Sequence, residues 1–160
     1  SMKIKDEFKI YLKSLQRTRK IATILAKNIK KGLCICLYGD LGTGKTTFSR
    51  FFINSLSKKN INVPSPTFSM VQLYELKNFN IWHYDLYRLS NKTEIFALDF
   101  DLALNDIVLI EWPAIIKDFL PSERIDIFFK EDKNRKLYIK LKLMGNLKIN
   151  NNSLRELDES

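Results

Sequence analysis

The segment from Gly39 to Thr46 constrains this chain more than any other. It reads GDLGTGKT and fits the pattern G-x-x-x-x-G-K-[ST] without exception. The run Leu33 to Tyr38 before it is continuously apolar, which predicts a strand covered on both faces. After it, phenylalanine and leucine residues repeat at helical spacing from Lys45 to about Ser57. A strand, a glycine-rich loop and a helix in this order predict a phosphate-binding loop in an α/β fold.

The residues of this loop suit the binding of a nucleotide. Glycines let the backbone curl so that successive N–H groups and the helix N-terminus face an anion. Lys45 supplies a positive charge to the β- and γ-phosphates, and the hydroxyl of Thr46 is a ligand for magnesium, which prefers oxygen. Thr47 either joins this site or only satisfies the first turn of the helix.

Turnover of a bound nucleotide also needs an acidic group that orders the metal or the attacking water. Glu111 ends the apolar run Ile107 to Ile110, so we expect it at the carboxyl edge of a central strand, where open α/β sheets bind ligands. The alternative for Glu111 is a loop residue that precedes Trp112 and Pro113. Asp85 is the second candidate, because strand alternation places it on one face with His83 and Tyr87, but such a polar face also fits solvated surface.

The remaining pattern predicts one domain built on a mixed parallel and antiparallel sheet flanked by helices. Residues 8–12 read as a strand, and Ser14 is the expected cap of a helix that follows. The other predicted elements are a hairpin (68–76 and 79–86), a helix (91–100), a strand (107–110) and an antiparallel pair (124–129 and 136–143). We expect residues 1–149 to form the domain and the polar residues 150–160 to form a disordered tail.

The composition fits a folded protein without a membrane segment. Of the 160 residues 45% are hydrophobic and 28% are charged, which excludes a wholly disordered or collagen-like chain. No apolar run approaches the ~20 residues that a spanning helix needs, and the N-terminus has no apolar signal segment. We therefore expect a cytoplasmic protein.

The positive charge lies at one end of the sequence. Residues 1–60 hold 14 lysine and arginine residues against 3 acidic ones, whereas residues 61–160 hold 13 against 15. Arg17, Lys20, Lys27 and Lys31 recur at helical spacing and form a basic stripe. The stripe is either a solvated helix face or a surface for an acidic partner or a nucleic acid.

Four segments together resemble the bacterial TsaE family, once called YjeE. They are GDLGTGKTTFSR (39–50), SPTF (65–68), HYDLYRL (83–89) and LIEWP (109–113), in the same order and at similar spacing. The resemblance covers most of residues 14–143 and implies a P-loop core with a mixed sheet. It also implies the ATPase of tRNA threonylcarbamoyladenosine biosynthesis, which hydrolyses ATP weakly alone and more actively with its partners TsaB and TsaD.

The resemblance assigns roles to particular positions. Lys45, Asp85 and Glu111 match residues needed for ATP turnover, and Thr46 and Glu111 match magnesium ligands. With the loop residues, the implied nucleotide contacts are Leu41, Gly42, Thr43, Gly44, Lys45, Thr46, Thr47, Leu15, Thr67, Trp112 and Arg135. Two positions depart from the family, because Thr43 replaces a usual alanine and Asp99 a common glycine.

Three functions remain open at this stage. The favoured one is a magnesium-dependent ATPase that acts on a complex of TsaB- and TsaD-type proteins and contacts tRNA only indirectly. A small-molecule kinase is the runner-up, although no arginine-rich lid segment follows the helices. The third is an ATP-binding switch without turnover, in which Glu111 only holds magnesium.

Overall fold

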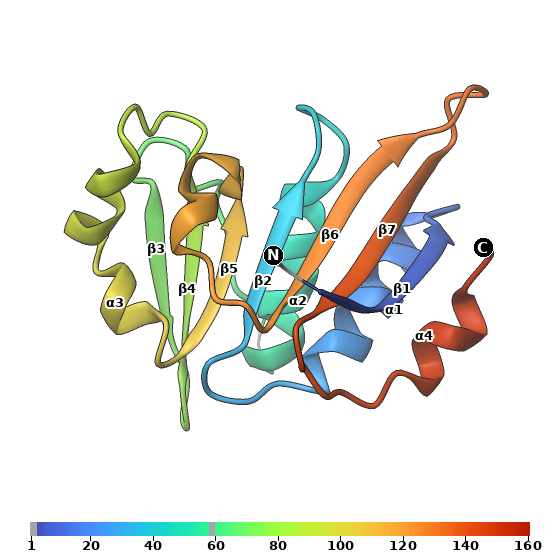
Figure 1. Ribbon diagram of the computed structural model, residues 1–160, viewed down its shortest axis with the longest axis horizontal. Coiled ribbons are helices and arrows are strands. Elements are labelled where there is room, and N and C mark those ends of the chain that lie inside the picture. Colours follow the sequence, from blue (N-terminus) through green and yellow to red (C-terminus); the bar gives the residue numbers. More distant parts are fainter. Residues whose placement is uncertain (1–2, 58–59) are drawn as a thin grey trace.

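The computed structural model describes residues 3–57 and 60–160 and contains a seven-stranded sheet with helices on both faces (Figure 1). In chain order the elements are β1 (Ile4–Tyr11), α1 (Leu15–Ala26), β2 (Cys34–Tyr38), α2 (Lys45–Ser57), β3 (Val71–Glu75), β4 (Asn80–Asp85), the 3-10 segment η1 (Lys92–Leu98), α3 (Phe100–Ala103), β5 (Ile107–Glu111), the 3-10 segment η2 (Pro113–Phe119), β6 (Arg124–Glu131), β7 (Leu137–Met144) and α4 (Asn152–Leu157). Among the described residues, no helix is long and apolar enough to cross a membrane.

The sheet is parallel at its centre and antiparallel at both edges. The strand order is β1-β7-β6-β2-β5-β4-β3. β2 pairs in parallel with β5 and β6, and β4 pairs in parallel with β5. The outer pairs β3·β4, β6·β7 and β1·β7 are antiparallel. The prediction of a mixed sheet is confirmed, and the carboxyl ends of β2, β4 and β5 lie at one edge.

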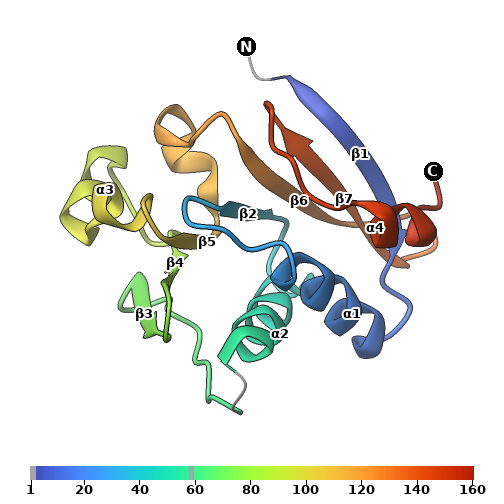
Figure 2. The same ribbon diagram turned by 90° about the horizontal axis from the view of Figure 1, so that it is seen from below.

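Helices α1 and α2 cover one face of the sheet, from β1, β7 and β6 across β2 to β5 (Figure 2). Ile35 and Leu37 of β2 point into this layer together with Ile125 and Ile127 of β6, and all four are fully buried. The side chain of Ser14 accepts a hydrogen bond from the N–H of Arg17 at 3.3 Å, so the predicted cap begins α1. This layer fixes α2 behind the glycine-rich loop.

In the part of the chain that the structure describes, helices cover the opposite face only over β2, β5 and β4. There η1, α3 and η2 pack on the buried side chains of Cys36, Val108 and Tyr84. The predicted helix over 91–100 is wrong in detail, because the segment is the 3-10 turn η1 followed by the short α3. Asp99 separates them in a left-handed conformation with φ of 59°. Aspartate tolerates this region better than most residues, which explains how it occupies a position that suits glycine.

The C-terminal segment is ordered, so the prediction of a disordered tail is wrong. α4 inserts Leu154 and Leu157 into the layer beneath α1 and β1. The N–H of Lys9 donates to Oδ1 of Asp158 at 2.9 Å, and the N–H of Glu159 donates to the carbonyl of Lys9 at 2.7 Å. Two leucines in a polar sequence gave too little apolar periodicity, and the surface that buries them is supplied by residues far away in the chain.

Replacing Leu154 with alanine tests this docking. Leu154 is fully buried, so the cavity left by Leu154→Ala is expected to lower the free energy of unfolding by about 2–5 kcal/mol. Urea unfolding followed by circular dichroism measures the change. Glu156→Ala on the exposed side of α4 is the matched control. Equal unfolding midpoints for the two variants would mean that α4 is not part of the folded domain.

Candidate active site

The glycine-rich loop connects β2 to α2 at the carboxyl edge of the sheet. Gly39, Gly42 and Gly44 all have positive φ. A Cβ on Gly39 would lie 2.8 Å from the carbonyl oxygen of Phe129, so only glycine fits there. The hydroxyl of Thr43 donates to the carbonyl of Asp40 at 2.8 Å, which ties the loop together at the position where the family usually has alanine. The loop therefore curls as a phosphate cradle requires.

Lys45 begins α2 and holds its ammonium group in the mouth of this loop. The side chain is largely buried, and Nζ donates to the carbonyl oxygens of Gly39 and Asp40. It also lies 4.2 Å from the centre of the Trp112 ring. Burial lowers the pKa of the Lys45 ammonium, and the nearby carboxylates, Glu111 foremost, oppose that shift. A positive charge is thus held beside the loop, and its hydrogen-bond acceptors there are backbone carbonyl oxygens.

Glu111 ends β5 and is the centre of a buried hydrogen-bond network. One carboxylate oxygen accepts from the hydroxyl of Thr46 at 2.8 Å. The other accepts from the hydroxyl of Ser49 at 3.2 Å and lies 2.6 Å from Nε2 of His83. Burial alone would raise the pKa of Glu111, but the hydrogen bonds from His83, Thr46 and Ser49 outweigh it and hold the pKa below its ordinary value. An ionised carboxylate therefore lies beside the Thr46 hydroxyl.

Asp85 lies beside Glu111, because the two residues pair in register at the ends of β4 and β5. It is buried, and its Oδ2 accepts from the hydroxyl of Thr67 at 2.8 Å. The N–H of Tyr87 donates to Oδ1 at 3.0 Å. The hydroxyl of Thr67 also lies 2.8 Å from that of Ser65. These contacts fasten the SPTF segment to the sheet edge through Asp85.

These side chains line one cavity of about 240 Å³. Its walls are Leu41, Gly42, Gly44, Lys45, Thr46, Thr47, Ser65, Thr67, Asp85, Glu111 and Trp112. Parallel strands end at the same edge of a sheet, which is why residues 70 positions apart in the chain meet here. The cavity combines a cation, two carboxylates and several hydroxyls, so it can hold a phosphate chain together with a hard divalent ion.

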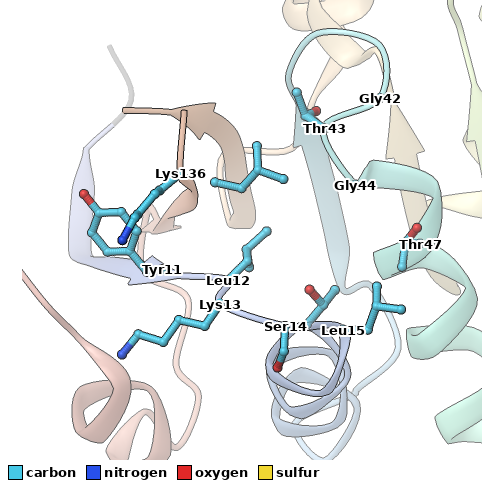
Figure 3. Close-up of a pocket in the computed structure, with 12 residues that line it drawn as sticks. Tyr11, Leu12, Lys13, Ser14, Leu15, Gly42, Thr43, Gly44, Thr47 and Lys136 are labelled. Carbon is cyan, nitrogen blue, oxygen red and sulfur yellow. The ribbon is translucent and has the colours of Figure 1, made fainter. Parts of the chain in front are cut away.

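A larger hollow of about 560 Å³ adjoins the loop on the side of α1 (Figure 3). Leu12, just after β1, lines it together with Leu15 and Thr18 of α1. Thr43 of the loop and Thr47 of α2 line its other side. Its apolar walls suit a flat ring next to a phosphate site. The predicted contact Leu15 is thus brought to the loop.

Arg135 lies on another side of the same loop. It occupies the turn between β6 and β7 and shares a hollow of about 790 Å³ with Gly39, Leu41 and Thr43. The loop is therefore flanked by Leu15 in one hollow and by Arg135 in another, and both reach it through residues distant in the chain. Each predicted site residue therefore lies in the loop or lines one of the three hollows described beside it.

Sequence reasoning gave no role to two residues that contact Glu111. His83 is completely buried and its Nδ1 has no hydrogen-bond partner within the part of the chain that the structure describes. Ser49 donates to the carbonyl of Lys45 at 2.9 Å as well as to Glu111. A signal existed for both, because Ser49 lies one helical turn after Lys45 and His83 lies two strand positions before Asp85. Tyr87 lies beyond β4, with its ring 4.9 Å from that of Trp112.

The glycine-rich loop between a central parallel strand and a helix, with a threonine hydroxyl beside a strand-end glutamate, defines a P-loop NTPase fold. The model of the family Threonylcarbamoyl adenosine biosynthesis protein TsaE matches residues 12–137. The chain belongs to the TsaE family.

Individual relatives agree with this assignment. The tRNA threonylcarbamoyladenosine biosynthesis protein TsaE of Rickettsia typhi is 44% identical over 128 residues, which cover 79% of this chain and 89% of that protein. The Bacillus subtilis protein of the same name is 34% identical over 131 residues and 82% of each chain. The crystal structure of Bacillus subtilis YdiB matches with a TM-score of 0.69 and 28% identity over 88% of each chain. The family's role in tRNA threonylcarbamoyladenosine biosynthesis therefore extends to this chain.

The contact between His83 and Glu111 can be measured as a coupling free energy. We expect His83→Leu and Glu111→Gln to be non-additive by about 0.5–3 kcal/mol in the free energy of unfolding, because each removes the same charge-assisted hydrogen bond. Urea unfolding of both single variants and the double variant gives the value. The control cycle pairs His83→Leu with Glu131→Gln on the exposed end of β6, where additivity is expected. Additivity in both cycles would contradict the contact.

Proposed function

We propose that this chain is the magnesium-dependent ATP-hydrolysing component of the machinery that makes threonylcarbamoyladenosine in tRNA. Its hydrolysis acts on a complex of TsaB- and TsaD-type proteins. The observation that carries the proposal is the hydrogen bond of 2.8 Å between Thr46 and the buried Glu111, directly beside the Lys45 ammonium.

The phosphate chain of ATP is held by the loop in this proposal. Backbone N–H groups of residues 42–47 and the N-terminus of α2 face the phosphates, and Lys45 exchanges its carbonyl partners for phosphate oxygens. The adenosine lies in the hollow beside Leu15 and Thr18, with Arg135 reaching the nucleotide from the other flank. A neighbouring apolar hollow and a polar cradle match the two chemically different ends of the nucleotide.

Thr46 and Glu111 are the residues that would hold magnesium. Both present hard oxygen atoms, and the ionised state of Glu111 fits a divalent cation. When bound, the ion neutralises charge on the β- and γ-phosphate oxygens. His83 and Ser49 keep the second carboxylate oxygen fixed, so that the first one stays directed at the Thr46 hydroxyl.

In this proposal Asp85 and Thr67 act at the γ-phosphate end of the cavity. Asp85 is a carboxylate within the same pocket as Lys45 and Glu111, so it can orient an attacking water by accepting its hydrogen bond. Thr67 couples that position to the exposed SPTF segment, where Phe68 is 82% exposed. A partner that contacts this segment would reach Asp85 through the Thr67 hydroxyl, which accounts for stimulation of hydrolysis by partners.

The nucleotide can be detected by the fluorescence of Trp112. The chain has two tryptophans, so a Trp82→Phe background isolates the signal of Trp112 next to Lys45. We expect ATP with magnesium to change the emission of this variant. Adding Lys45→Ala should weaken binding by tenfold or more, because the charge-assisted phosphate contact is lost. Lys133→Ala on the exposed turn is the control. An unchanged titration in Lys45→Ala, with the circular dichroism spectrum intact, would overturn the nucleotide site.

Turnover is expected to depend on both acidic residues while binding does not. Asp85→Asn and Glu111→Gln should bind ATP within a few-fold of the parent chain and lose about 10²–10³ in phosphate release. Phosphate release is measured with the chain alone and with TsaB and TsaD proteins, and Asp101→Asn on exposed α3 is the control. Release of phosphate without an added acceptor separates an ATPase from a kinase. Absence of release with partners present would overturn the ATPase and leave a kinase or a nucleotide-binding switch.

A further inference from the structure

One half of one sheet face carries no helix. The strands β1, β7 and β6 pack one face against α1, α2 and α4, whereas η1, α3 and η2 cover the other face only over β2, β5 and β4. Figure 2 shows α1 and α2 on a single side of β6 and β7. Within residues 3–57 and 60–160, no helix lies over the opposite side of β1, β7 and β6.

Four aromatic rings gather on this open face. They are Tyr11 of β1, Tyr138 of β7 and Phe128 of β6, together with Tyr38 of β2, which lies at the border and also packs against the covered half. The strand register brings them together, because Tyr11 pairs with Tyr138 and Tyr38 pairs with Phe128. The rings of Tyr38 and Phe128 are stacked at 4.4 Å with an angle of 11°, and those of Tyr11 and Tyr138 lie 5.4 Å apart. All four rings are half-buried, because they contact one another and lie under neighbouring lysine side chains, and the remaining ring surface faces water.

Four lysines alternate with these rings. In the same register Lys9 pairs with Lys140, which pairs with Phe128, and Lys130 pairs with Tyr138. The ammonium of Lys9 lies 4.8 Å from the centre of the Tyr138 ring, and that of Lys142 lies 4.8 Å from the centre of the Phe128 ring. Flexible lysine side chains thus cover rings that no helix covers. They can move aside or pack on the far side of a stacked base.

The charge of this aromatic–lysine face is positive, although Asp132 accepts a hydrogen bond from the Tyr11 hydroxyl at 3.0 Å and offsets part of that charge. Glu7 lies beside Lys142 at 3.6 Å and offsets one lysine. Asp126 of β6 is buried and paired with Arg124 at 2.8 Å, so it adds no net charge to the face. The lysines at positions 9, 130 and 140 remain without an ion pair among the described residues. The face therefore suits an anionic partner that also has flat rings.

We propose that the aromatic–lysine face binds single-stranded RNA. Its lysines would neutralise backbone phosphates, and its rings would stack with unpaired bases, the combination by which open sheet faces bind single strands. An acidic protein surface would pair with the lysines, but it would not present a flat ring beside each anionic group, as a nucleotide does. The proposal differs from the expectation that tRNA contacts this chain only indirectly. Nothing in the sequence indicated the platform, because its rings lie in four separate strands and come together only when the sheet is assembled. It stands independently of ATP hydrolysis.

Fluorescence anisotropy of a labelled single-stranded RNA of about 12 nucleotides, added to the full chain, tests the proposal. Binding should weaken with salt with a slope of up to roughly −3, because single strands lose about 0.7 per neutralised phosphate and the face has four lysines. Replacing Lys9, Lys130, Lys140 and Lys142 together by glutamine should weaken binding at least tenfold. The matched control replaces Arg17, Lys20, Lys27 and Lys31 of the basic stripe by glutamine, which changes the net charge equally but should alter affinity less than threefold.

The rings are tested separately from the charges. Phe128→Leu with Tyr138→Leu keeps apolar side chains but removes two stacking surfaces, so it should weaken RNA binding about tenfold or more while leaving binding to an abasic ribose-phosphate strand unchanged. Urea unfolding confirms that each variant is folded, and Tyr138→Phe is expected to bind RNA like the parent chain. Equal losses in the two charge variants, equal binding of abasic and normal strands, or binding of polyglutamate as tight as that of RNA would each overturn the proposal.

Discussion

The site depends on one buried carboxylate, that of Glu111. It joins α2 through Thr46 and Ser49 and joins β4 through His83, so a single side chain links the phosphate-loop helix to two strands. A buried carboxylate is costly unless it is hydrogen-bonded on every side, and here three donors meet that requirement. The ionised form is retained as a consequence, and it lies where a metal and a phosphate chain would need it. The hydrogen bonds that make the burial of Glu111 tolerable are thus the same ones that keep its carboxylate ionised.

The topology of the sheet supplies this arrangement and also divides the surface of the protein. Because β2, β4 and β5 are parallel, their carboxyl ends bring the loop, Asp85 and Glu111 to one edge. The strands β6, β7 and β1 extend the sheet beyond the area that η1, α3 and η2 cover. That extension carries Arg135 to the loop and leaves the aromatic–lysine face open. Tyr38, which is followed directly by Gly39, is the point where the open face reaches the phosphate loop.

The elements at the two ends of the chain belong together although they lie furthest apart in sequence. The family model matches residues 12–137, so all of β1 and all of α4 fall outside that match. β1 pairs with β7, and α4 packs beneath it with Leu154 fully buried. β1 contributes Lys9 and Tyr11 to the open face and Leu12 follows it into the hollow beside Leu15. These terminal elements therefore stabilise this edge of the sheet, and they also help to form the open face and the hollow beside Leu15.

The sequence by itself determined the phosphate loop, the mixed sheet and the family, because each is written in local patterns: glycines at fixed spacing, an apolar strand before them, and four motifs in order. It also predicted Thr46 and Glu111 at the nucleotide site from their positions after the loop and at a strand end, and the resemblance to the family added Asp85. Only the tertiary structure decided the hydrogen bond of His83 to Glu111, the docking of α4 and the platform of Tyr11, Tyr38, Phe128 and Tyr138. Those features depend on register between distant strands and on surfaces supplied by distant residues, and no local period encodes either of them.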